Sequence, residues 1–130
     1  MNPRGYETID YEIIKDFWIG HNWTAVPIEL LPITGIVIQE EDHIYCAAWL
    51  YVDQTAPIGW MEWIVTNPEN TPRESLKSID MVVKEILRLA VICELKVLMT
   101  SVNNEGLVKL YEKNEFKPSD TNMTNMMRFL

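Results

Sequence analysis

The sequence lacks any long apolar run. No stretch approaches the roughly 18 consecutive apolar residues that a membrane-spanning helix needs. The opening residues, MNPRGYETID, also lack the apolar segment of a signal peptide. From these two absences we expect a soluble, cytoplasmic protein with no membrane partner.

Cysteine and histidine are scarce. The two cysteines, Cys46 and Cys93, are far apart and lie in apolar surroundings, and the two histidines, His21 and His43, stand alone. No Cys-x-x-Cys pair or other metal-ligand spacing is present, which argues against a structural zinc site and a disulfide framework. We therefore expect buried free thiols and no bound metal.

Basic residues are few. Eleven Lys and Arg stand against 19 Asp and Glu, which gives a formal net charge of −8. A nucleic-acid surface needs clustered basic side chains to neutralise phosphates, so we expect no nucleic-acid partner. The same charge is compatible with a cationic partner such as an amine.

Apolar and aromatic residues are plentiful enough for one core. The 130 residues are 48% hydrophobic and include five Trp, five Tyr and three Phe. Such a composition excludes disorder and predicts a single domain over residues 1–130.

Hydrophobic periodicity and turn residues predict alternating helices and strands. Asp10 is a good N-cap for a helix over 11–19, which Gly20 ends. A second helix follows the capping box Thr71-Pro72-Arg73-Glu74, with apolar residues three and four apart from 76 to 90. A third helix begins near Asn104. Strands are predicted at 33–39, 44–52, 58–66 and 95–101, from Phe116, and over TNMMRFL at 124–130.

These elements predict an α+β fold. Short turns between the strands at 33–39, 44–52 and 58–66 imply an antiparallel meander. The helix that follows implies a right-handed parallel crossover to the strand at 95–101. We expect a mixed, mostly antiparallel, twisted sheet of about six strands with helices on both faces.

The stretch NNEGLVKLYEKNEF at 103–116 carries a family resemblance. Asn104 stands seven residues before Tyr111, Leu110 precedes the tyrosine, and Glu112-Lys113 follow it. This pattern, within the same order of elements, resembles the last helix of the GNAT superfamily of N-acetyltransferases. The family has Gly-Phe after the helix, whereas this sequence has Glu115-Phe116. The resemblance implies a GNAT-like fold with acetyl-CoA as co-substrate.

The resemblance implies roles for two residues of that helix. Asn104 would hold the pantetheine arm of coenzyme A through its amide. Tyr111 would protonate the departing thiolate as a general acid. The alternative is that Asn104 is only an N-cap and Tyr111 only a half-buried aromatic.

The pyrophosphate-binding turn of the family corresponds to residues 73–78. The family pattern Gln/Arg-x-x-Gly-x-Gly/Ala falls on Arg73, Glu74, Ser75, Leu76, Lys77 and Ser78. Leu76 replaces a glycine, and its Cβ would obstruct close approach to the phosphates. Glu74 would compete with the anion, while Arg73 and Lys77 would partly offset that charge. A plain capped helix that binds nothing is the alternative.

The strand IGWMEWIVT at 58–66 corresponds to the family strand that lies against the acyl chain. Its end, Ile64, Val65 and Thr66, would offer main-chain groups to the pantetheine arm and the acetyl carbonyl. Glu62 is the strand's only ionisable side chain. The resemblance implies that Glu62, directly or through water, takes the proton of the attacking amine. The alternative is a solvent-facing glutamate on an alternating strand.

The predicted function is transfer of an acetyl group from acetyl-CoA to a primary amine of a small molecule or protein. The segments 19–32 and 53–57 would select the acceptor, and neither segment has a recognisable signature, so the acceptor is not identified. Two alternatives remain open at this point. One is a catalytically inactive binding module, and the other is an assembly protein that uses its five tryptophans as a contact surface. A homodimer is compatible with each of them.

Overall fold

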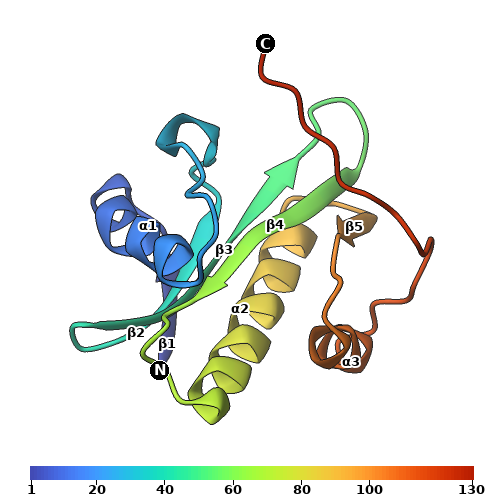
Figure 1. The fold of residues 1–130 in the computed structure, drawn as a ribbon. Coiled ribbons are helices and arrows are strands. Elements are labelled where there is room, and N and C mark those ends of the chain that lie inside the picture. Colours follow the sequence, from blue (N-terminus) through green and yellow to red (C-terminus); the bar gives the residue numbers. More distant parts are fainter.

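One five-stranded sheet organises the chain, as Figure 1 shows. The computed structural model describes residues 1–130. The strands lie in the order β1-β2-β3-β4-β5 across the sheet. The elements along the chain are β1 Asn2–Gly5, the 3-10 helix η1 Thr8–Asp10, α1 Tyr11–Gly20, the 3-10 helix η2 Ile28–Leu30, β2 Gly35–Glu40, β3 His43–Val52, β4 Ile58–Thr66, α2 Pro72–Ile92, β5 Val97–Thr100 and α3 Glu105–Lys113.

The predicted meander is confirmed. β2 pairs with β3 and β3 with β4, both antiparallel, while β4 pairs in parallel with β5. Helix α2 makes the crossover between β4 and β5, and it covers the whole predicted range 76–90. The mixed α+β class predicted from the sequence is therefore the class observed.

The helices cover both faces of the sheet and close two cores. Helices α2 and α3 pack on one face through residues such as Val82, Ile86 and Tyr111. Helix α1 packs on the other face, where Phe17 and Trp18 meet Trp49 of β3. Figure 1 shows α1 and α2 on opposite sides of the sheet. None of the helices combines the length and apolar character that crossing a bilayer requires.

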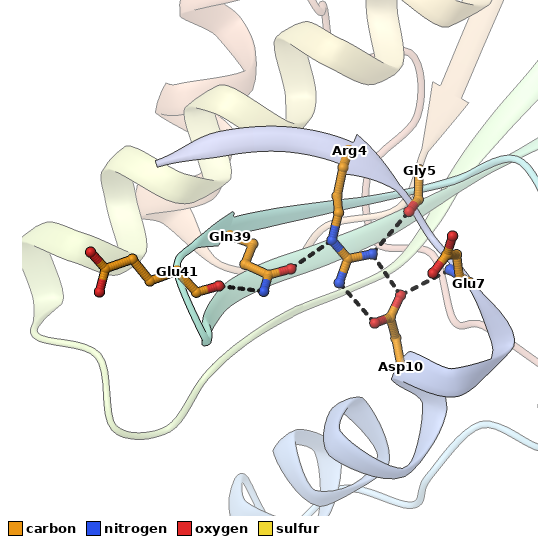
Figure 2. A network of polar contacts seen from close by, with 6 residues as sticks. All are labelled: Arg4, Gly5, Glu7, Asp10, Gln39 and Glu41. Carbon is orange, nitrogen blue, oxygen red and sulfur yellow. Dashed lines mark hydrogen bonds and ion pairs between the residues drawn. The ribbon is translucent and has the colours of Figure 1, made fainter.

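Strand β1 was not predicted; it pairs with β2, and a partly buried ion pair also connects it to the start of α1 (Figure 2). The Arg4 guanidinium donates to both carboxylate oxygens of Asp10, at 2.8 and 2.9 Å, and to Gln39 of β2 at 2.6 Å. Burial alone would raise the pKa of Asp10, but the hydrogen bonds from Arg4 and from the Glu7 N–H lower it. Asp10 does stand at the N-cap position of α1, yet its carboxylate makes no bond to that helix.

The two strands predicted after α3 are not formed. Residues 116–130 contain no strand, so the sheet has five strands and not six. Glu115, where the resemblance led us to expect glycine, has a positive φ of 67°, a region that disfavours side chains with a Cβ. Pro118 supplies no N–H, and the apolar side chains of Met126 and Phe129 stay exposed. This segment with strand-like composition therefore stays unpaired, although β5 is an edge strand with a free side.

Candidate active site

Strands β4 and β5 separate part-way along their length. They pair only from Ile58 to Met61 on β4, opposite Val97 to Thr100 on β5. The Thr100 hydroxyl donates to the Met61 carbonyl at 2.8 Å and ends the contact. Beyond Met61, no strand lies beside the β5-facing edge of β4, which continues to Thr66. The backbone of residues 62–66 is thus available to a ligand on that edge.

A bulge in β4 lies at this separation. Glu62 pairs with Trp49 and Val65 with Ala47, so β4 carries one more residue than β3 across the interval. Trp63 takes a φ of 61° there, which is rare for a bulky residue. Bulges bend a strand and strengthen its twist. The bulge therefore accounts for the divergence of β4 from β5 beyond Met61.

Glu62 is a half-buried carboxylate without a partner. It accepts no hydrogen bond from the protein and joins none of the ion pairs. Burial raises its pKa above the ordinary value for glutamate. An uncompensated carboxylate in such surroundings is suited to accept a proton or to bind a cationic group.

Tyr111 approaches the same region from helix α3. Its side chain is 3% exposed, its ring lies 5.5 Å from that of Phe116, and its hydroxyl donates to no protein acceptor. Burial raises the pKa of the Tyr111 phenol to about 12, with smaller contributions from Cys46 and Glu62. Glu62 contributes to the raised pKa of Tyr111, although it pairs with Trp49 of the core on the α1 side, whereas Tyr111 lies in the core on the α2 side.

Asn104 is the N-cap of α3. Its Oδ1 accepts from the Leu107 N–H at 3.1 Å, as the N-cap interpretation expected. The amide Nδ2 donates to no protein acceptor, and the side chain is exposed. Contact between Asn104 and a pantetheine arm stays a prediction.

The predicted pyrophosphate turn is the beginning of helix α2. Helix α2 starts at Pro72, and the capping box between Thr71 and Glu74 is formed on both sides. Leu76 is 53% exposed, whereas Ser78 is fully buried and donates to the Ser75 carbonyl. Residues 73–78 therefore form helical turns with side chains on different faces, and not one loop facing a ligand.

Two aromatic residues next to Glu62 were missed from the sequence. The Trp63 indole donates to the Tyr51 hydroxyl at 2.8 Å, and that hydroxyl donates to the Leu30 carbonyl at 2.5 Å. Burial raises the pKa of Tyr51, and Glu62 adds to the shift. This chain of bonds ties η2 to the bulge. The available signal was the loss of alternation after Met61, where Glu62, Trp63 and Ile64 follow without a two-residue period.

His21 occupies part of the predicted binding surface. Its Nε2 lies 2.8 Å from the Thr66 carbonyl, so this main-chain oxygen already has a partner. The His21 ring stacks on Trp23. Among the main-chain groups predicted to bind at 64–66, the Thr66 carbonyl is thus already engaged by His21.

The tryptophans do not form one contact surface. Trp18 and Trp49 are buried and stacked with ring centroids 5.7 Å apart, while Trp60 and Trp63 are partly buried. Only Trp23 is exposed, at 54%. The tryptophan content is therefore mostly explained by the core on the α1 side.

Comparison with solved structures fits this geometry. A Trypanosoma brucei acetyltransferase, 14% identical, aligns with a TM-score of 0.71 over 97% of this chain and 99% of that one. The chain has a GNAT-like fold. An N-acetyltransferase from Staphylococcus aureus Mu50, 15% identical, aligns at 0.70 over 89% of this chain and 82% of that one.

A third structure with the GNAT-like fold was solved with coenzyme A. This Mycobacterium tuberculosis protein is 14% identical and aligns with a TM-score of 0.73 over 95% of this chain and 76% of that one. No protein-family model matches the sequence, and no curated protein is similar enough in sequence to count as a relative. At these identities the likeness establishes the fold.

Proposed function

We propose that the protein transfers an acetyl group from acetyl-CoA to a primary amine. The observation that carries the proposal is the β4 edge left unpaired by β5 beyond Met61, where the unpaired stretch begins with Glu62 and the charge of Glu62 contributes to the raised pKa of Tyr111 on α3. Both side chains have raised pKa values, and neither has a hydrogen-bond partner within the protein. A base and an acid without internal partners are what a proton-transfer reaction needs.

The proposed reaction is a direct transfer. Glu62, or a water beside it, takes a proton from the ammonium group, and the free amine attacks the thioester carbonyl. The C–N bond forms, the C–S bond breaks, Tyr111 gives its proton to the leaving thiolate, and the second proton lost by the amine nitrogen restores the Tyr111 phenol. Backbone N–H groups of residues 64–66 that point away from β3 would stabilise the oxyanion.

A weaker second candidate is a GNAT-like binding module without turnover. The closed start of α2, where Thr71 and Glu74 cap the helix, favours it, because the N–H groups that would meet a pyrophosphate are engaged. Turnover separates the two candidates, because both accept a thioester ligand and only one consumes it.

The test combines binding with turnover. Acetyl-CoA at about 100 times its dissociation constant should stabilise the protein by roughly 2.7 kcal/mol. Incubation with acetyl-CoA and a panel of primary amines should release free thiol and yield an acetylated amine, detected by thiol titration and mass spectrometry. Stabilisation without any product would support the binding module. Neither stabilisation nor product would remove both candidates.

A further inference from the structure

The segment that joins β4 to α2 has almost no free backbone N–H. Anions bind at helix N-termini because the first N–H groups there lack intrahelical partners. Between Asn67 and Ser75, Pro68 and Pro72 have no N–H at all, and only the Arg73 N–H lacks an acceptor. The engaged donors are those of Asn67, Glu69, Asn70, Thr71, Glu74 and Ser75.

The chain's own carboxylate occupies the place of an anion. Glu74 accepts from the Thr71 N–H at 2.9 Å, and this hydrogen bond lowers its pKa. A negative charge is therefore already fixed in the first turn of α2, where it interacts favourably with the helix dipole. A bound phosphate would have to displace that carboxylate or lie next to it.

The remaining side chains do not build a phosphate cradle. Leu76 stands where close backbone approach needs glycine, and its side chain is exposed beside the helix start. Arg73 and Lys77 are exposed and form no ion pair. Solvent and salt weaken attraction from such side chains, and Glu69 and Glu74 oppose it.

The β4 edge differs in each of these respects. It is unpaired beyond Met61, it holds Glu62, and the Asn104 amide Nδ2 at the start of α3 is free. This edge can bind amide groups of a pantetheine arm, which need main-chain partners and no positive charge.

From this contrast we infer that the donor is recognised as an S-acyl-pantetheine, and that the nucleotide diphosphate of acyl-CoA adds little to binding. The inference rests on the proposed acyl transfer. The chemistry is unchanged: the thioester C–S bond breaks, the C–N bond forms and the pantetheine thiol leaves with a proton.

The first experiment compares donors that share the pantetheine arm. We expect kcat/KM for S-acetylpantetheine and for acetyl-CoA to agree within about threefold. Pantetheine and coenzyme A should raise the melting temperature equally at equal concentration, and adenosine 3′,5′-bisphosphate should not raise it. Any larger advantage for acetyl-CoA would overturn the inference and leave the proposed acyl transfer intact. No turnover of either thioester would remove the proposed function itself, and this inference with it.

The second experiment opens the helix start. The double change Thr71→Ala/Glu74→Ala frees two N–H groups and removes the carboxylate, so preference for acetyl-CoA over S-acetylpantetheine should rise by about tenfold. Glu74→Gln keeps the capping bonds and removes only the charge, so the preference should rise less. This single variant gives the answer if the double variant does not fold.

The matched control is Glu85→Ala, which removes a carboxylate from the same helix several turns away. It should leave the donor preference unchanged. If neither Glu74→Gln nor the double variant raises the preference above the control, the helix start does not govern donor choice and the inference is wrong.

Discussion

The β4 edge and the start of α2 use their polar groups in opposite ways. Glu62 on β4 and Tyr111 on α3 have no hydrogen-bond partners in the protein. At the start of α2, nearly every N–H has an acceptor and a carboxylate closes the first turn. The first region keeps groups free for a ligand at a cost in stability. The second uses comparable groups to stabilise the helix.

When a protein has low sequence similarity to proteins of known structure, its free polar groups indicate where the chemistry takes place. A helix start in the right place for phosphates does not bind them if its donors are used internally. An incomplete strand pairing with two unpartnered titratable side chains is the more informative feature.

The strongest test of the proposed role of Tyr111 at the β4 edge is the change Tyr111→Phe. The hydroxyl makes no protein hydrogen bond, so stability and thioester binding should hardly change, while the acetyl-transfer rate should fall by roughly 10²–10⁴. Single-turnover rates and melting curves of the purified variant provide the measurement.

Tyr11→Phe is the matched control for that change. The Tyr11 hydroxyl donates to the Val26 carbonyl at 2.7 Å, so its loss should cost about 1 kcal/mol of stability and leave the rate alone. A Tyr111→Phe variant that turns over at the wild-type rate would remove Tyr111 from the mechanism.

A smaller effect is expected for Glu62→Gln. The rate should fall by roughly 10², at the lower end for a general base, because water can still take the proton. The wild-type kcat/KM should rise with pH through the raised pKa of Glu62, and the variant should lose this limb of the profile.

The same variant makes a statement about stability. Because the folded pKa of Glu62 is raised, its favourable contribution is present below the unfolded pKa and is lost as pH rises through the folded one. Glu62→Gln should therefore melt higher than wild type near neutral pH, and the difference should shrink in mild acid. A change at the exposed Glu112 to Gln serves as control. Equal pH profiles for Glu62→Gln and wild type would contradict the base assignment.

The smallest effect is expected at the start of α2. Thr71→Ala removes the side-chain cap of α2 and should cost about 1 kcal/mol of stability, with kcat/KM for S-acetylpantetheine unchanged. Denaturant unfolding and steady-state kinetics measure the two quantities. A loss of rate without a loss of stability would show that the helix start takes part in catalysis after all.

Local patterns predicted most of the fold. Runs of β-branched and aromatic residues between turn residues predict strands β2, β3 and β4. The capping box and the helical spacing of apolar residues predict α2. Strand β1, NPRG, has no such pattern, and its place in the sheet comes from long-range pairing with β2 and from the Arg4–Asp10 ion pair. The reverse happened at the C-terminus, where TNMMRFL has strand-like residues but forms no strand.

The site was predictable only where a resemblance supplied it. The motif around Tyr111 indicated the residue that we propose as the acid, and Glu62, the only carboxylate in β4, is the residue that we propose as the base. The link from Trp63 through Tyr51 to Leu30 joins three segments far apart in the chain, so no local pattern encodes it. The capping box at the start of α2 could be predicted from the sequence. That nearly every backbone N–H before it also has an acceptor could not be predicted.

Deleting one residue at the Trp63 bulge would have the opposite effect on strand register from a deletion in a regular strand. Loss of one residue ordinarily turns every later side chain to the opposite face. Here β4 already holds one residue more than β3 between the Glu62–Trp49 and Val65–Ala47 pairs. Removing Trp63 would leave both pairs in register and make β4 a regular strand. The extra residue is therefore dispensable for the sheet, and what it secures is the bend that keeps β4 away from β5.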